Sequence, residues 1–288
     1  MKRKLIIASG VFSVVALAFG LFVWHEGNVL IAPSNCEIRK PPADWPVELV
    51  AFPSSSGAMV HGWLMKSDSD KGVVILMHGI RANRWQLAEH AEFLFHAGYT
   101  VLLFDFQGHG ESVGRHITAG YLESRDAAAA VKFIRQRFSG KKICADGFSM
   151  GGAAAVLAQP PLHVNAMILQ SVYPTIEQAI TARLESRLGW FGKLGTPLLT
   201  WQLKPRLGFG VDDLCPIQQV GKITSPKLFI AGTIDRDTTL PESKALFAAA
   251  AEPKQLWLVD GAGHVDMLAF ARIEYKKRIL IFLEKNLN

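Results

Sequence analysis

Continuously apolar runs of strand length constrain the fold of this chain most strongly. Val73–Met77 and Val101–Phe104 contain no polar residue, a pattern typical of strands that are covered on both faces of a sheet. Further strand candidates alternate with helix-length segments from residue 47 onward. This alternation favours an α/β fold, in which helices pack on both faces of a mostly parallel sheet.

Strand and helix candidates alternate through residues 47–172 and 227–285. The strand candidates are Val47–Phe52, Gly62–Lys66, Val73–His78, Thr100–Phe106, Lys142–Phe148, Ala166–Val172, Lys227–Asp235 and Gln255–Val259. The helix candidates are Trp85–His96, Tyr121–Phe138, Met150–Ala158 and Ala271–Lys285. A short Ser/Gly turn at residues 54–57 separates the first two strands, so we expect them to form an antiparallel hairpin at the start of an eight-stranded sheet. Residues 174–226 contain no strand candidate and are expected to form a cap insertion.

The first 24 residues have the composition of a membrane-spanning helix. Lys2, Arg3 and Lys4 precede Leu5–Trp24, which is twenty residues without a charge. As a helix, this run spans about 30 Å, the thickness of the hydrocarbon core of a bilayer. The positive-inside rule then places residues 1–4 in the cytoplasm and the catalytic domain on the other side, which in a bacterial host is the periplasmic face.

A cleaved signal peptide is the alternative for this segment. Ala16-Leu17-Ala18 offers a small-x-small cleavage site, and cleavage there would give a secreted protein. The apolar run continues past this site to Trp24, where a signal peptide normally turns polar, so we expect an uncleaved anchor at residues 5–24. Residues 25–46 contain four prolines and are expected to be an extended tether.

The distribution of charge and the spacing of the Cys, His and Gly residues argue against a nucleic-acid partner, a metal site and a dinucleotide cofactor. The first four residues supply half of the net charge of +6, and 28 basic and 25 acidic side chains follow them, so we expect no nucleic-acid partner. Neither a CxxC pair nor an HExxH motif occurs, so no metal is predicted. The glycines at positions 108, 110 and 114 have the wrong spacing for a dinucleotide loop, and no cofactor is predicted.

The three cysteines are too few for a disulfide framework. Cys144 lies on a strand candidate and is expected to be a small buried hydrophobe. The sequence leaves open whether Cys36 and Cys215 pair in an oxidising compartment.

A candidate nucleophile follows the strand that ends at Phe148. Gly147-Phe148-Ser149-Met150-Gly151 lies between that strand and a helix of small residues, which is the context that the G-x-S-x-G motif requires. A serine at such an elbow has a strained backbone, and the flanking glycines avoid clashes with it. Because the elbow exposes the hydroxyl above the sheet and directs a helix N-terminus at the reacting carbonyl, the motif predicts that Ser149 is a nucleophile.

Serine needs a base to take its proton, and the base needs an acid to fix its tautomer. Two histidines follow Ser149 in the chain. His264 comes directly after a strand candidate, whereas His163 lies in a proline-containing loop and is expected at the surface. Asp235 ends a strand candidate at the sheet edge where ligands bind in open α/β folds, which favours it as the acid. Asp237, two residues later, is the alternative.

Together these motifs resemble the α/β-hydrolase superfamily. The resemblance rests on His78-Gly79, the elbow at Ser149, Gly232-Thr233-Ile234-Asp235 and Gly263-His264, in the order Ser…Asp…His that the superfamily uses. Asp105–Ser112 also resembles the D-x-x-G-x-G-x-S turn of its lipase, esterase and serine-aminopeptidase-like members. The resemblance covers about residues 47–286.

The resemblance implies a role for each matching residue. Ser149 is the nucleophile, His264 the base and Asp235 the acid that orients the base. His78 and His109 precede the elbow and are expected to pack turns rather than to act as bases.

The resemblance also implies an oxyanion hole of two backbone N–H groups. One is that of Met150, and the other follows His78-Gly79. Because Ile80-Arg81 stands where lipases carry further glycines, the second donor stays open between Ile80, which we prefer, and Arg81.

A triad with an oxyanion hole transfers an acyl group to water through an acyl-enzyme. The cap insertion is rich in apolar side chains, which are Leu188, Trp190, Phe191, Leu198, Leu199, Trp201, Leu203 and Leu207. If they line the site they favour an apolar acyl group or a lipid-like ester, and packing of the cap onto the sheet is the equal alternative. We therefore expect a membrane-tethered hydrolase of carboxylic esters. A peptidase or thioesterase with the same triad, or an inactive binding scaffold, is the alternative, because the fold does not select the leaving group.

Overall fold

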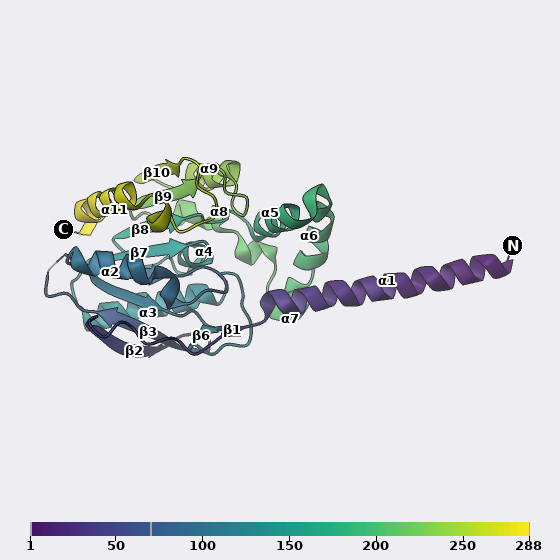
Figure 1. Ribbon diagram of the computed structural model, residues 1–288, viewed down its shortest axis with the longest axis horizontal. Coiled ribbons are helices and arrows are strands. Elements are labelled where there is room, and N and C mark those ends of the chain that lie inside the picture. The colour runs from purple at the N-terminus through teal and green to yellow at the C-terminus, as the bar shows by residue number, and fades with distance from the viewer. Residues whose placement is uncertain (1, 70, 288) are drawn as a thin grey trace.

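In the computed structural model, an eight-stranded sheet lies between two layers of helices, and helix α1 projects away from them (Figure 1). The structure describes the backbone of residues 2–69 and 71–287, and the side chains of residues 17–69, 71–186 and 189–287. The strand order is β10-β9-β8-β7-β4-β5-β3-β2. Strand β3 pairs antiparallel with β2 and with β5, and the other pairings are parallel. The predicted α/β fold with an antiparallel entry hairpin is confirmed.

The eight strand candidates correspond to the eight strands of this sheet. The strands are β2 (Val47–Pro53), β3 (Met59–Met65), β4 (Val73–Met77), β5 (Thr100–Phe104), β7 (Ile143–Phe148), β8 (Ala166–Gln170), β9 (Lys227–Gly232) and β10 (Lys254–Val259). The two-residue strands β1 (Ser34–Asn35) and β6 (His109–Gly110) pair separately. The prediction that a strand runs to Asp235 is wrong. Gly232 pairs with Val259, the last residue of β10, so β9 has no strand partner beyond that point.

The helices of the two layers are α2 (Ala88–His96), α3 (Glu123–Arg137), α4 (Met150–Leu157), α9 (Leu240–Ala249), α10 (Met267–Phe270) and α11 (Arg272–Leu287). The cap insertion contributes α5 (Ile176–Leu188), α6 (Gly192–Thr200), α7 (Leu203–Leu207) and α8 (Pro216–Gln219), and its described residues form no strand. Short 3-10 turns lie at η1 (Arg84–Leu87), η2 (Gly189–Phe191), η3 (Val211–Leu214) and η4 (Val220–Lys222). In Figure 1 the helices α5 and α6 stand together beyond the edge of the sheet, next to α1.

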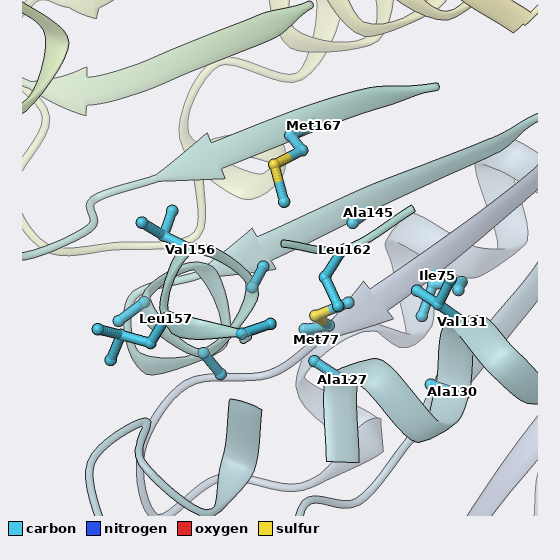
Figure 2. Packing of buried hydrophobic residues seen from close by; sticks show 14 of the residues in the cluster. Ile75, Met77, Ala127, Ala130, Val131, Ala145, Val156, Leu157, Leu162 and Met167 are labelled. Atoms are coloured by element: carbon cyan, nitrogen blue, oxygen red, sulfur yellow. The ribbon is translucent and has the colours of Figure 1, made fainter. Parts of the chain in front are cut away.

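The alternation of side chains along each strand produces two hydrophobic cores. Ile75 and Met77 of β4 point towards α3 and α4, as Figure 2 shows, whereas Val74 and Leu76 pack on the side of α2 and α11. All four side chains are buried, and each such burial contributes about 1.5–3 kcal/mol. The two cores hold the carboxyl ends of the parallel strands in place, and the loops that follow these strands carry the candidate site.

Helix α1 runs from Lys2 to Ile31. Residues 25–31 are therefore helical, and the predicted extended tether is wrong for them. The helix ends shortly before Pro33, since the residue before a proline disfavours helical backbone. The anchor prediction over residues 5–24 falls in large part on residues 5–16, whose side chains lie outside the described residues. Within the part of the chain whose side chains the structure describes, no helix is both long enough and apolar enough to span a bilayer.

Candidate active site

The turn between β7 and α4 holds Ser149 in a backbone conformation that few residues other than glycine adopt. Its φ is 51° and its ψ is −115°, outside the favoured regions for an L-residue. A Cβ at position 151 would overlap the carbonyl oxygen of Met77, and one at position 147 would overlap the backbone nitrogen of Gly152. The glycines of the G-x-S-x-G motif are therefore required by close backbone approach, as the motif predicts.

Ser149, His264 and Asp235 come from three separate loops, and His264 lies within hydrogen-bonding distance of both of the others. His264 Nε2 is 3.1 Å from Ser149 Oγ, and His264 Nδ1 is 2.9 Å from Asp235 Oδ2. The Asp235 side chain is fully buried, and its Oδ1 accepts the backbone N–H groups of Asp237 and Thr238 at 2.8 and 2.9 Å. In this arrangement the carboxylate keeps the proton of the imidazole on Nδ1, and Nε2 is free to take the proton of the hydroxyl.

The residues that compete with this triad in the sequence lie elsewhere. Asp237 lines the same cavity as Ser149, but among the described residues no hydrogen bond joins it to His264. His163 is exposed, and its carbonyl oxygen accepts the Arg135 guanidinium at 2.8 Å. The structure therefore brings His264 rather than His163 to Ser149, and Asp235 rather than Asp237 to His264.

Two backbone N–H groups beside Ser149 are available to bind an oxyanion. Met150 is the first residue of α4, where backbone N–H groups have no partner within the helix. Within the described residues, the N–H of Ile80 donates to no other backbone group, whereas that of Arg81 donates to His109 Nε2 at 3.1 Å. Ile80 and Met150 line one cavity with Ser149. This geometry favours Ile80 over Arg81 as the second donor.

Two buried histidines brace the loop that carries Ile80. His78 Nδ1 donates to the carbonyl of Gly79 at 2.7 Å, and its Nε2 accepts the N–H of Phe106 at 3.1 Å. Burial lowers the pKa of His78 to about 3, and burial also lowers the pKa of His109. Both rings are therefore neutral near pH 7, and each keeps a lone pair on Nε2 to accept a backbone N–H. They pack turns, as expected.

The Asp105–Ser112 turn has a similar bracing role. Asp105 is fully buried and accepts the Arg84 guanidinium at 2.6 Å, and its Oδ2 also accepts the N–H of Glu111 at 2.9 Å. The Ser112 hydroxyl donates to the backbone carbonyl of Asp105 at 2.7 Å. The glycine-containing turn is thereby fixed against the strand that precedes it.

A buried polar network below the His264 loop was not found from the sequence. His90 Nε2 donates to Asp266 Oδ1 at 2.9 Å, and the Tyr275 hydroxyl lies 3.1 Å from His90 Nδ1. Gln170 Nε2 donates to the Tyr275 hydroxyl at 2.9 Å and to Asp146 Oδ1 at 2.7 Å. The one available signal was local, since an aspartate directly before the apolar run at residues 267–270 is a typical helix N-cap.

Asp266 connects this network to the candidate base, which lies two residues earlier in the chain. Its Oδ1 also accepts the N–H of Leu268 at 2.8 Å, which caps α10. Burial opposes its ionisation, but the hydrogen bond with His90 and those with the backbone outweigh burial, and the pKa of Asp266 is lowered. The ionised carboxylate fixes the His264 loop to α2 and α10.

Asp146→Asn is expected to stabilise the protein at neutral and alkaline pH. Asp146 is buried, its Oδ2 has no partner, and burial raises its pKa to about 6 from 3.8. The folded state therefore binds the proton more tightly than the unfolded state, and stability is lost as the pH rises from about 4 to about 6. Relative to the parent, we expect the unfolding free energy of D146N to rise by about 2 kcal/mol between pH 4 and pH 8.

Urea denaturation of both proteins at pH 4, 6 and 8 measures this difference. The exchange of the exposed Asp68 for Asn is the control. A pH dependence of D146N that matches that of D68N would contradict the expectation.

A cavity of about 450 Å³ opens above Ser149. Its apolar lining comes from the loops after the strands, from the cap and from the end of α1, and includes Leu30, Ile31, Ile176, Ile180, Leu199, Leu203, Leu207 and Leu214. Three of the apolar cap residues singled out in the sequence, Leu199, Leu203 and Leu207, therefore line the site. Four others, Trp190, Phe191, Leu198 and Trp201, are 41–70% exposed, and the side chain of Leu188 lies outside the described residues.

The described residues contain no cluster of three or more His, Cys, Asp or Glu side chains that could hold a metal ion. The three cysteines carry free thiols, with Cys36 exposed and Cys144 and Cys215 buried. The pairing of Cys36 with Cys215 that the sequence left open is therefore not formed, and Cys144 is buried as expected.

Comparisons with known proteins agree with this fold. Residues 68–209 match the family described as serine aminopeptidase, S33. The Bacillus subtilis protein YqkD is 23% identical over 99% of this chain and 98% of its own length. Human monoglyceride lipase is 25% identical over 68% of this chain and 76% of its own length.

Solved structures extend the likeness to the whole fold. The esterase Pf2001 of Pyrococcus furiosus superposes with a TM-score of 0.72 and 26% identity, over 89% of this chain and 100% of the esterase chain. The stretch that matches the serine aminopeptidase family includes the Ile80 loop and the elbow at Ser149. The chain therefore belongs to the α/β-hydrolase superfamily and is a hydrolase.

Proposed function

We propose that this hydrolase cleaves carboxylic esters through an acyl-enzyme on Ser149. The observation that carries the proposal is the chain of hydrogen bonds from Ser149 through His264 to the buried Asp235. His264 Nε2 takes the hydroxyl proton while Ser149 Oγ attacks the ester carbonyl carbon. The N–H groups of Met150 and Ile80 stabilise the resulting oxyanion.

The same groups carry out the remaining steps, with His264 acting in turn as acid and as base. Collapse of the tetrahedral intermediate breaks the bond to the alcohol, which leaves with the proton held on His264. A water molecule then gives a proton to His264 Nε2 and attacks the acyl carbon. The second collapse releases the carboxylic acid and returns the proton to Ser149 Oγ, while Asp235 stabilises the imidazolium in both halves.

The substrate class follows from the cavity and from the relatives. Apolar side chains of the cap, among them Leu199 and Leu203, line the cavity above Ser149, and they match an acyl chain better than a charged peptide. Two of the relatives are named as an esterase and a monoglyceride lipase. These observations support an ester with an apolar acyl or lipid-like part as the substrate.

A panel of p-nitrophenyl esters of graded acyl length, run beside aminoacyl p-nitroanilides, tests this function. We expect kcat/KM to rise with acyl length until the cavity is filled, since each buried methylene contributes about 0.8 kcal/mol. We expect the anilides to react far more slowly than the best ester. Faster cleavage of an anilide than of every ester would contradict the proposal and favour a peptidase.

We propose in addition that residues 5–24 anchor the enzyme in a membrane, with residues 1–4 in the cytoplasm and the catalytic domain on the opposite face. The support is the sequence, in which three cationic residues precede twenty uncharged ones, and the continuity of α1 across this segment. An alkaline carbonate wash is expected to leave the ester hydrolase activity in the membrane pellet. Release of the intact chain, or a mature N-terminus at Phe19, would contradict the anchor.

A further inference from the structure

The C-terminal end of α1 packs against the cap at the mouth of the catalytic cavity. We call residues 23–31 the α1 end. Gln202, between α6 and α7, donates from Nε2 to the carbonyl of Val23 at 3.1 Å. The guanidinium of Arg206 on α7 lies 3.8 Å from the centre of the Trp24 ring and donates to the Trp24 carbonyl. Figure 1 shows α7 directly beside this end of the helix.

The α1 end also contacts the loop that carries the candidate oxyanion donor. The guanidinium of Arg81, which follows Ile80, donates to the carbonyls of Val29 and Leu30, the latter at 3.1 Å. A cation at this position is favourable because the last carbonyls of a helix have no partner within the helix. The carbonyl of Ile31 accepts the backbone N–H of Ile117 at 2.8 Å. The α1 end is therefore held both by the cap and by the oxyanion loop.

One face of the α1 end lines the cavity above Ser149. Gly27, Leu30 and Ile31 are spaced three and four residues apart, so they lie on the same side of the helix, and all three line the cavity. Gly27 is buried where α1 meets the cap, and a Cβ at this position would overlap Oε1 of Gln202. Glycine here leaves room for the ends of the Gln202 and Arg206 side chains, which join the cap to α1.

We propose that the α1 end is a wall of the acyl pocket and determines the acyl length that the enzyme accepts. Leu30 and Ile31 contact the apolar part of the acyl group, and Gly27 leaves room for the two side chains, Gln202 and Arg206, that join this wall to the cap. The proposal rests on the proposed ester hydrolysis at Ser149. It makes residues 23–31 part of the binding site instead of a passive connection between an anchor and a catalytic domain.

A matched pair of glycines on the same helix tests the wall. Gly20 lies seven residues before Gly27, and a Cβ there meets no atom within 4 Å. Gly27→Leu is therefore expected to displace the Gln202 and Arg206 side chains and so to loosen the attachment of α1 to the cap, whereas Gly20→Leu makes the same exchange without displacing them. The readout is kcat/KM for p-nitrophenyl decanoate divided by kcat/KM for p-nitrophenyl acetate, measured on the full chain. We expect G27L to lower this ratio by about tenfold or more and G20L to leave it unchanged.

A second pair of variants keeps the test valid if G27L does not fold. Leu30→Trp fills part of the cavity without separating the helices and is expected to lower the same ratio. Leu21→Trp is its control, because Leu21 is exposed on α1 and does not line the cavity. Hydrolysis of the acetate ester by L30W shows that the variant is folded and active.

The outcomes separate the wall from the function on which it rests. An unchanged ratio in L30W, with acetate hydrolysis retained, would overturn the wall while leaving ester hydrolysis in place. Failure of the parent chain to hydrolyse any ester and to react with a fluorophosphonate would overturn the proposed function, and the wall with it. An equal fall of the ratio in L30W and L21W would also overturn the wall, since the effect would then not come from the cavity.

Discussion

Ser149→Ala is expected to lower kcat for ester hydrolysis by about 10⁴- to 10⁶-fold. The hydroxyl supplies the attacking oxygen, and its hydrogen bond to His264 Nε2 is the contact through which its proton leaves. The exchange removes one oxygen and no apolar packing, so the thermal unfolding midpoint is expected to stay close to that of the parent. Initial rates with the best p-nitrophenyl ester, measured beside thermal unfolding, check both parts. Activity within tenfold of the parent would show that Ser149 is not the nucleophile.

Asp235→Asn is expected to lower kcat by about 10⁴-fold, because an amide no longer holds the Nδ1 proton of His264 as the carboxylate does, and the ring then presents the wrong tautomer to Ser149. The geometry behind this expectation is the 2.9 Å contact between His264 Nδ1 and Asp235 Oδ2.

Asp237→Asn is the matched control for Asp235→Asn. It makes the same chemical change two residues away, at the edge of the same cavity, and no described hydrogen bond joins it to His264. We expect its effect on kcat to be far smaller. A larger loss in D237N than in D235N would assign the acid to Asp237.

The parts of the site that follow local rules could be predicted from the sequence. The strained turn at Ser149 needs glycines within two residues of it, so the motif specifies both the nucleophile and the turn. His264 and Asp235 each follow a strand at the same edge of the sheet, and parallel strands bring such loops together. Asp235 contacts His264, but the strand end on which its prediction rested is wrong, since β9 stops at Gly232 where β10 stops.

The features that the sequence did not reveal depend on contacts between distant residues. His90 and Asp266 are 176 positions apart, and no local pattern links them. The predicted tether begins at residue 25, yet Arg81 donates to the carbonyls of Val29 and Leu30 at the end of a helix, and Arg206 donates to the carbonyl of Trp24 just before this segment. The apolar cap residues divide into those that line the cavity and those that are exposed. Their spacing in the sequence has no regular helical period that would predict this division.

We propose that His264 and Asp235 together activate Ser149. Labelling of the intact chain with a fluorophosphonate, followed by mass spectrometric mapping of the modified peptide, tests it most directly. We expect a single adduct on Ser149 in the parent, much slower labelling in His264→Ala and none at that position in Ser149→Ala. Absence of an adduct on Ser149 in the folded parent, or equally fast labelling of Ser149 in His264→Ala, would contradict it.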